Sequence, residues 1–489
     1  MTMILGVDTG GTFTDFVLFS KHEIRIHKVL STPSAPEQAI LQGIRALGLD
    51  GLPKGELWVV HGSTVATNAA LEGKGARTAF VTNRGLKDIL TIGRQARREL
   101  YNLTPMPDAP PVPADLCFET GGRLSAEGEL LEPLTEADIE SLLEALQQAK
   151  PEAVAICLLF SFLQPDQERR LRAALDADYF VSCSHEVLPD YGEYERGIAT
   201  WLNASLGPVM RRYLMRLKEK LETVPVTIMQ SSGGTLALEQ AQSRAVNLML
   251  SGPAGGLSGA RFMGEIAGQH QLLTFDMGGT STDVAVIDGE IRLTSEGRIG
   301  RWPVGVPMVD MVTIGAGGGS IAYIDAGGLL QVGPESAGAS PGPACYGRGG
   351  STATVTDANL VLGRIQPDFF LGGQMQLDVA AARQALAELG SALGLSTEAA
   401  AYGVIRLANE HMVRALRMIS VERGYDLTGF ALCSFGGAGG LHVCALADAL
   451  GMSRALVPHY AGVLSAFGMG VAPRVRHLSA SHKCPVRQL

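Results

Sequence analysis

The 489-residue sequence has little of several features that mark common protein classes. Its seven cysteines form no C-x-x-C pair and are scattered through apolar runs, which excludes a disulfide scaffold and fits a reduced compartment. The longest apolar run, residues 153–163, is too short to span a bilayer, so we expect no membrane association. The net charge is −9 and no basic stripe with interleaved aromatic residues occurs, which gives no support to nucleic-acid binding.

The usual nucleotide and metal signatures are also missing. No G-x-x-x-x-G-K-[ST] loop occurs, and residues 315–320 match the dinucleotide fingerprint only in part, without the acidic residue expected about 20 residues later. The ten histidines form neither H-x-x-x-H nor H-x-H, so no transition-metal site is indicated. Residues 1–4 lead directly into a predicted strand, so we expect no signal peptide and a cytoplasmic location.

Glycine, in contrast, is abundant and recurs in one motif. Sixty glycines accompany 46% hydrophobic and 6% aromatic residues, as in a globular α/β enzyme of two to four domains. Residues 8–15, Asp-Thr-Gly-Gly-Thr-Phe-Thr-Asp, return at 276–283 as Asp-Met-Gly-Gly-Thr-Ser-Thr-Asp, with six of eight positions identical. Each copy lies between two apolar runs, which predicts a β-hairpin. Two such hairpins suggest two related domains that face each other across a cleft.

The turn of each hairpin is predicted to hold phosphate. Its glycines allow the backbone to adopt positive φ and to approach a ligand without a Cβ in the way. Successive N–H groups then form an anion-binding nest, to which threonine hydroxyls add donors. Asp8 and Asp276 end the first strand of each hairpin, where they are placed to hold Mg²⁺ through water. One copy alone is as easily structural, but two copies with the carboxylate in the same place favour a phosphate and Mg²⁺ site.

A third glycine-rich segment follows the predicted buried strand 430–435. It contains Gly436, Gly437 and Gly439 and leads into a predicted helix at residues 441–450. A strand, a glycine loop and a helix make room for a nucleoside near the helix N-terminus. The alternative is a tight strand-to-helix turn, which needs fewer glycines.

These three segments, in this order, resemble the actin, sugar-kinase and chaperone ATPase superfamily, and within it the motifs are similar to those of the hydantoinase A/5-oxoprolinase family. The segments that carry the resemblance are residues 6–15, 61–68, 251–256, 275–283, 310–320, 435–440 and 460–466. The match reaches about Pro473, and residues 474–489 form a polar, basic tail where family members usually carry a further region.

The resemblance implies an α/β fold of two related actin-like ATPase domains, with mixed sheets flanked by helices, facing across a nucleotide cleft. We expect a first domain at residues 1–190, a second at 191–473 and a tail at 474–489. The implied reaction is ATP-dependent hydrolysis of a cyclic amide, such as 5-oxoproline, a hydantoin or a related lactam, through phosphorylation of the carbonyl oxygen. A hydantoinase B-like partner subunit and an oligomeric enzyme are implied as well. Phosphoryl transfer depends on positioning and charge neutralisation, which two facing nests and Mg²⁺ supply.

The predicted site combines three groups of residues. Asp8, Asp276 and Asp310 are the expected catalytic carboxylates, and the first two are also the expected metal ligands. Contacts to ATP are expected from Thr9, Gly10, Gly11, Thr12, Thr14, Gly278, Gly279, Thr280, Gly317, Gly318, Gly436, Gly437 and Gly439. Substrate contacts are expected from His61, Ser63, Thr64 and Asn68, which follow a predicted strand; the alternative is an N-cap cluster.

Two other functions stay open. The first is the ATPase subunit of an acetone- or acetophenone-type carboxylase, which would phosphorylate an enolate instead of an amide. The second is a nucleotide-gated conformational protein that binds ATP without a small substrate. The polar segments 61–68 and 310–320 argue against the second function, because a conformational switch does not require them.

Overall fold

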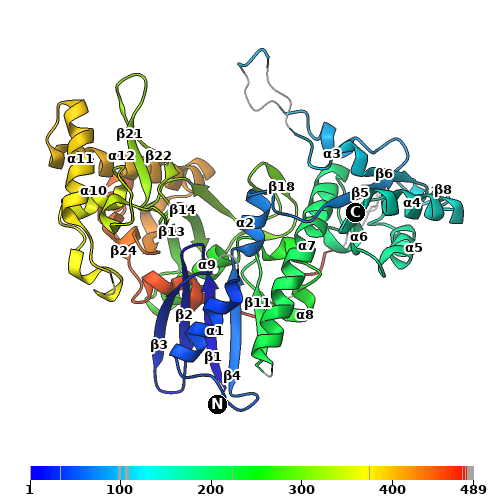
Figure 1. The fold of residues 1–489 in the computed structure, drawn as a ribbon, viewed down its shortest axis with the longest axis horizontal. Helices are drawn as coiled ribbons and strands as arrows, with labels where there is room; N and C mark the ends of the chain where they lie inside the picture. The colour runs from blue at the N-terminus through cyan, green and yellow to red at the C-terminus, as the bar shows by residue number, and fades with distance from the viewer. Residues whose placement is uncertain are drawn as a thin grey trace.

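The computed structural model describes residues 2–32, 35–96, 101–104, 109–222, 224–373, 375–475, 477–479 and 481. Of the predicted tail at 474–489, residues 476, 480 and 482–489 therefore lie outside the described residues. Three larger sheets organise the chain, and two of them contain the two predicted hairpins (Figure 1).

The first hairpin lies in a six-stranded sheet of order β12-β11-β4-β1-β2-β3. β1 (Met3–Thr9) and β2 (Phe13–Phe19) pair antiparallel, as predicted, with Asp8 opposite Asp15. The other strands are β3 (Ile24–Leu30), β4 (Leu57–Ser63), β11 (Val226–Met229) and β12 (Thr235–Ala237). Helix α1 (Pro36–Ala46) covers one face, where its Gly43 lets the ring of Phe16 pack against the helix backbone.

The second hairpin repeats this plan in a sheet of order β15-β14-β13-β23-β24, in which β20 also pairs with β14. β13 (Gln271–Met277) and β14 (Thr282–Asp288) pair antiparallel, with Asp276 opposite Asp283. β23 (Ala431–Phe435) runs parallel to β13, just as β4 runs parallel to β1. The remaining strands are β15 (Glu290–Ile291), β20 (Met311–Ile314) and β24 (Ala455–Leu456). Residues 7–15 and 275–283 have the same sequence of buried, partly buried and exposed positions.

Two helices join these sheets at the centre of the molecule. α9 (Ser251–Ile266) and α14 (Leu464–Val471) cross in such close contact that a Cβ added to Gly468 would lie 1.8 Å from the carbonyl oxygen of Gly255. α14 also lies against β1, where a Cβ on Gly6 would be 1.9 Å from the carbonyl oxygen of Ala466. One hydrophobic cluster contains residues of both sheets and both helices, so the two hairpins are fixed relative to each other.

A third sheet of four parallel strands, β10-β9-β5-β6, lies on the right in Figure 1. Its strands are β5 (Thr78–Asn83), β6 (Cys117–Thr120), β9 (Ala153–Ile156) and β10 (Phe180–Cys183). The helices around it are α3 (Ile89–Ile92), α4 (Glu136–Ala149), α5 (Asp166–Leu175), α6 (Ser184–Val187) and the long α7 (Glu193–Leu221). α7 packs against this sheet and reaches the first one, since its residues share a hydrophobic cluster with β5 and β11.

A mainly helical region covers the second sheet, on the left in Figure 1. It contains β21 (Ser320–Ile324), β22 (Leu330–Ser336), α10 (Val355–Val361), α11 (Val379–Leu393), α12 (Thr397–Ile419) and α13 (Val443–Leu450). The short elements of the chain are α2 (Val65–Leu71), α8 (Leu238–Ala241), β7 (Arg123–Leu124), β8 (Leu130–Glu132), β16 (Leu293–Thr294), β17 (Gly297–Ile299), β18 (Trp302–Val304) and β19 (Met308–Val309).

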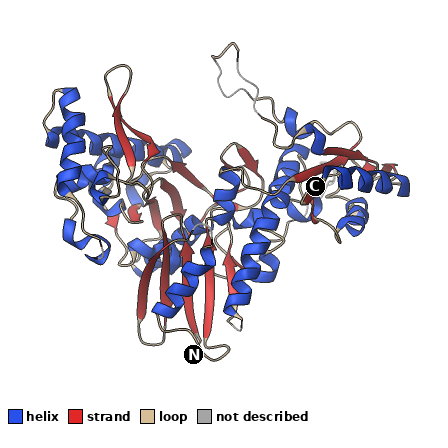
Figure 2. Ribbon diagram, in the orientation of Figure 1, coloured by secondary structure: helices blue, strands red, loops and turns tan. Residues whose placement is uncertain are grey.

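The prediction of an α/β fold with two related halves, mixed sheets and flanking helices is confirmed (Figure 2). The boundary at residue 190 stays a prediction, and β11 and β12, which follow it in sequence, add to the first sheet. Among the described residues, no helix has the length and apolar character needed to cross a membrane.

Candidate functional site

The turns of the two hairpins line one cleft of about 840 Å³. Of the residues predicted from the sequence, those that line it are Asp8, Gly10, Gly11, Thr12, Asp276, Gly278, Gly279, Thr280, Gly318, Gly436 and Gly437. Segments more than 260 positions apart in the chain therefore meet at one site, as the duplicated motif predicts.

The two turns are closed in the same way. The amide of Gly10 donates to the carbonyl oxygen of Phe13 at 3.0 Å, and the amide of Gly278 donates to that of Ser281 at 3.0 Å. The prediction of positive φ for these glycines is wrong, because none of the four turn glycines adopts the left-handed conformation. Their lack of a side chain matters for another reason: a Cβ at Gly11 or Gly279 would project into open space, which glycine leaves free for a ligand.

The carboxylates of Asp8 and Asp276 face this cleft from opposite sheets. Burial, and then the negative charge of Asp15, raise the pKa of Asp8 to about 7. Burial raises the pKa of Asp276 to about 8, with further contributions from Asp283, Asp8 and Asp15. Oδ1 of Asp8 is buried and accepts no hydrogen bond within the described part of the chain. A divalent cation would supply the missing partner and offset this repulsion, so the residues fit a metal held by Asp8 and Asp276.

Two further carboxylates and a lysine complete the charge distribution. Asp15 lines the cleft and forms an ion pair with Nζ of Lys28 at 2.5 Å. Asp283 accepts a hydrogen bond from Oγ1 of Thr313 at 2.7 Å, and burial raises its pKa to about 6. The sequence prediction assigned no role to these residues. Lys28 reaches Asp15 because β2 pairs with β3 in a register that places the two residues opposite each other. The sequence alone does not reveal this register.

The loop at residues 315–320 supports the second hairpin. The amide of Gly318 donates to Gly278 at 3.0 Å, and the amide of Gly319 donates to Gly279 at 2.6 Å. Contrary to the prediction, Gly317 does not line the cleft. It packs against the hairpin, where a Cβ would lie 2.7 Å from the carbonyl carbon of Gly279. Gly439 is likewise a packing residue, since a Cβ there would lie 2.6 Å from Oγ of Ser434.

Thr9 and Thr14 do not line the cleft, contrary to the prediction. Both are buried, and Oγ1 of Thr14 lies 3.0 Å from Oγ of Ser31. Successive strand residues point to opposite faces, so a strand that directs Asp8 toward the cleft directs Thr9 away from it. The same alternation separates Thr14 from Asp15.

The predicted substrate segment also lies outside the cleft lining. His61 is fully buried in β4, with Nε2 at 2.6 Å from the hydroxyl of Tyr213 and Nδ1 at 3.2 Å from the carbonyl oxygen of Val7. Burial lowers the pKa of His61 to about 4. Ser63 is buried as well, with its amide donating to Oγ of Ser251 at 3.0 Å. These contacts hold β1 and α9 in place behind the hairpin.

The remaining predicted residues are positioned by other contacts. Oγ1 of Thr64 donates to the carbonyl oxygen of Thr9 at 3.2 Å, and the exposed Asn68 donates to Thr64 at 3.4 Å. Asp310, predicted to be catalytic, lies between β19 and β20 and accepts a hydrogen bond from Nη1 of Arg423 at 2.6 Å. Asp310 does not line the cleft, and its side chain forms this ion pair instead.

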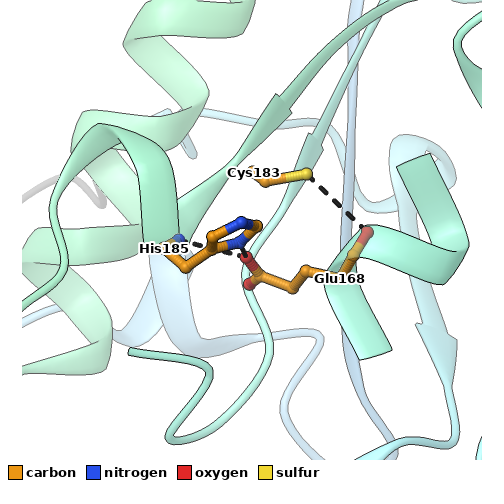
Figure 3. A group of neighbouring side chains, drawn as sticks. All are labelled: Glu168, Cys183 and His185. Carbon is orange, nitrogen blue, oxygen red and sulfur yellow. Dashed lines mark hydrogen bonds and ion pairs between the residues drawn. The ribbon is translucent and has the colours of Figure 1, made fainter. Parts of the chain in front are cut away.

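A separate cluster of possible metal ligands lies beside the parallel sheet and consists of Glu168, Cys183 and His185 (Figure 3). Both carboxylate oxygens of Glu168 are already used. One accepts from the amide of Leu158 and from Oγ of Ser184, and the other accepts from the amide and Nδ1 of His185, at 2.6 to 3.1 Å. Burial is the largest single contribution and raises the pKa of Glu168. The hydrogen bonds and the charge of His185 together outweigh burial, so the pKa is lowered. The cluster is explained by its own hydrogen bonds, which join α5 to α6 and to the segment that follows β9.

Comparison with known proteins gives the same family for both parts of the chain. Residues 4–178 match the hydantoinase/oxoprolinase N-terminal region, and residues 196–477 match hydantoinase/oxoprolinase. Caprolactamase subunit alpha from Pseudomonas jessenii is 40% identical over 485 residues, which cover 95% of this chain and 69% of the relative. The gamma subunit of acetophenone carboxylase from Aromatoleum aromaticum is 34% identical over 511 residues, which cover 98% of this chain and 69% of the relative.

A solved structure agrees with these sequence matches. The crystal structure of the ATP-dependent caprolactamase from Pseudomonas jessenii superposes with a TM-score of 0.84 at 38% identity, covering 95% of this chain and 70% of that chain. Two of these relatives are named as subunits, so the chain is similar to components of multi-subunit enzymes. The chain is a member of the hydantoinase/oxoprolinase family.

Proposed function

We propose that the chain is the ATPase subunit of an enzyme that hydrolyses a cyclic amide by phosphorylating its carbonyl oxygen. The observation that carries this proposal is the meeting of two equivalent Asp-x-Gly-Gly-Thr turns at one cleft. The family and the name of the ATP-dependent caprolactamase support ATP as the phosphoryl donor and a lactam-like ring as the acceptor.

In this proposal the turn amides and the hydroxyls of Thr12 and Thr280 bind the phosphates from two sides. Asp8 and Asp276 hold Mg²⁺, which supplies positive charge to the phosphates when it is bound. Lys28, held by Asp15, adds a fixed cation at the same end of the cleft. Each of these groups acts by position and charge, which is what phosphoryl transfer needs from a protein.

The choice of cyclic amide is the finer part of the proposal. An amide carbonyl is a poor electrophile because resonance shares the nitrogen lone pair with it. Phosphorylation of the oxygen converts it into a leaving group and makes the carbon open to attack by water. We propose that a hydantoinase B-like subunit completes the enzyme, since relatives of this chain are named as subunits alpha and gamma.

A second candidate is the ATPase subunit of a ketone carboxylase, which the acetophenone carboxylase relative favours. The experiment that separates the two measures ADP release by the purified chain, alone and with its partner subunit, with three kinds of acceptor. These are 5-oxoproline and caprolactam, hydantoin, and a ketone with bicarbonate. Stimulation by a cyclic amide supports the proposal, and stimulation only by the ketone with bicarbonate replaces it with the carboxylase. If no acceptor changes turnover while a protein partner does, the chain is a nucleotide-gated conformational protein.

A further inference from the structure

A buried amide in the wall of the cleft has an oxygen without a hydrogen-bond donor among the described residues. Asn359 lies on α10, its residue is 1% exposed, and it lines the same cleft as the two hairpins. Its Oδ1 accepts no hydrogen bond within the described part of the chain. A buried acceptor without a donor costs free energy, which a bound ligand with a donor in the right place would recover.

The orientation of this amide is set by a chain of three side chains. Nδ1 of His442 lies 2.6 Å from Oδ1 of Asn409, and an amide oxygen can only accept, so Nδ1 carries the proton. Burial, with the positive charge of Arg364, lowers the pKa of His442 to about 4, so the ring is neutral at neutral pH and Nε2 is an acceptor. The nitrogen of Asn359, 3.4 Å away, therefore faces Nε2, and its oxygen is left without a donor among the described residues.

The neighbours of Asn359 connect it to the hairpins. Three residues earlier on α10, the amide and Oγ1 of Thr356 donate to the carbonyl oxygen of Gly318 at 2.7 and 2.8 Å. Gly318 in turn donates to Gly278 of the second hairpin. His442 directly follows the short helical turn Gly439–Leu441, next to Gly436 and Gly437 of the cleft. A molecule with its phosphates at the hairpins can thus place its other end at Asn359.

The cleft wall around Asn359 suits a flat ring. Tyr346 and Phe370 lie with their ring centroids 5.7 Å apart, and Ile365 and Met375 add aliphatic surface. A pocket with aromatic and aliphatic walls and a few placed polar groups binds a planar heterocycle and fixes its orientation. Arg348, Arg364 and Gln366 also line the cleft. The group that Oδ1 of Asn359 requires on that ring is a hydrogen-bond donor.

We propose that Asn359 selects the nucleobase, with its side-chain oxygen accepting a hydrogen bond from the exocyclic amino group of adenine. A 6-oxopurine such as guanine or hypoxanthine would present a carbonyl oxygen to the same atom, and two acceptors repel each other. His442 and Asn409 are positioning residues, because they hold the amide in the orientation that favours an amino group. This inference rests on the proposed function, in which the cleft binds a nucleotide.

The test compares three diphosphates that differ only at position 6 of the purine: ADP, with an amino group, IDP, with a carbonyl, and purine riboside diphosphate, with hydrogen alone. Their dissociation constants are measured by calorimetry in the presence of Mg²⁺. The wild-type chain should bind ADP at least about tenfold more tightly than IDP, since a site built for a donor rejects an acceptor strongly. Purine riboside diphosphate should fall between them.

The variants then assign the preference to residues. In Asn359→Leu the ratio of the IDP and ADP dissociation constants should fall toward one, while the affinity for purine riboside diphosphate stays within about twofold. His442→Phe should lower the ratio of the IDP and ADP dissociation constants as well, because the side-chain amide of Asn359 can then rotate. Gln384→Leu, which replaces an exposed amide on α11 outside the cleft, should leave all three affinities unchanged. Unaltered purine riboside diphosphate binding shows that a variant is folded.

Two results would overturn the inference, and they are distinct. If all three diphosphates bind with the same affinity, or if Asn359→Leu keeps the wild-type preference, base selection by Asn359 is wrong while nucleotide binding stands. If none of the diphosphates binds to the wild-type chain, the proposed function is wrong and the inference falls with it.

Discussion

The carboxyl groups of Asp8 and Asp276 belong to different sheets, and yet they lie close enough that the charge of Asp8 contributes to the raised pKa of Asp276. The pKa of Asp276 is raised to about 8 by burial first, then by Asp283, and then by Asp8 and Asp15. The helices α9 and α14 hold the two sheets together, so this repulsion cannot be relieved by moving the carboxylates apart. The fold therefore concentrates carboxyl groups where the proposed cation would bind.

The first prediction concerns this pair. In Asp8→Asn or Asp276→Asn, we expect Mg²⁺-dependent ADP release to fall at least about 100-fold, because one anchor of the metal is lost. The thermal unfolding midpoint in the absence of metal should be unchanged or raised, because a repelled carboxylate has been neutralised. Enzyme assay and calorimetry measure the two effects. Asp310→Asn is the matched control and should keep ADP release within about threefold of wild type. Wild-type turnover in either cleft variant would remove the metal assignment.

The second prediction concerns the glycines of the turns. Gly11→Ala and Gly279→Ala add a methyl group that meets no protein atom within 4 Å and sits at a backbone conformation open to alanine. We expect unchanged thermal stability and at least about tenfold weaker ADP binding, because the methyl group occupies the space of the phosphates. Gly436→Ala gives the contrast: its φ is +80° and the new Cβ would lie 2.2 Å from Oδ1 of Asp276. That variant should lose stability as well as binding.

The duplicated motif was enough to predict the hairpins, the cleft and the two facing carboxylates. A repeat in sequence indicates a repeat in structure, and an Asp one residue before the end of each strand lies beside the turn that follows. Two of the predicted ATP contacts do not line the cleft, and they share one reason. Thr9 and Thr14 belong to the motif but point to the other face of their strands, which the motif alone does not specify.

Other parts of the site depended on packing that sequence order does not reveal. His61 reads as a polar residue at a strand end, but Tyr213 of α7, about 150 positions later, lies 2.6 Å from its ring. Lys28 enters the site through the register of β3, and Asn359 enters through α10. Neither belongs to a recognisable motif. These contacts are set by how distant elements pack, so a single sequence gives no signal for them.

The third prediction tests how the two sheets are held together. Gly468→Ala should lower the free energy of unfolding by about 3 kcal/mol or more. The new Cβ would lie 1.8 Å from the carbonyl oxygen of Gly255, and relieving this clash requires the helix backbones to move apart. Denaturant unfolding measures the change. Gly440→Ala is the control, since a Cβ there meets nothing within 4 Å. Equal stability of the two variants would contradict the close crossing of α9 and α14.

The fourth prediction concerns the buried His61, whose pKa is lowered to about 4 by burial. Between pH 6.5 and 4 the unfolded chain binds a proton at this site and the folded chain does not, so stability falls as the pH falls. The loss attributable to His61 should reach about 3 kcal/mol at pH 4. His61→Gln keeps polar atoms near Tyr213 but cannot titrate, so its unfolding free energy should depend less on pH over this range.

Denaturant unfolding at pH 7, 6, 5 and 4 compares wild type, His61→Gln and the exposed control His22→Gln. The absolute stability of His61→Gln is expected to be lower at pH 7, because the hydrogen bond to Tyr213 is altered. The informative quantity is therefore the change of the unfolding free energy with pH, and not its value at any one pH. Parallel curves for wild type and His61→Gln would mean that His61 is protonated in the folded chain, and its burial between β1 and α7 would have to be revised.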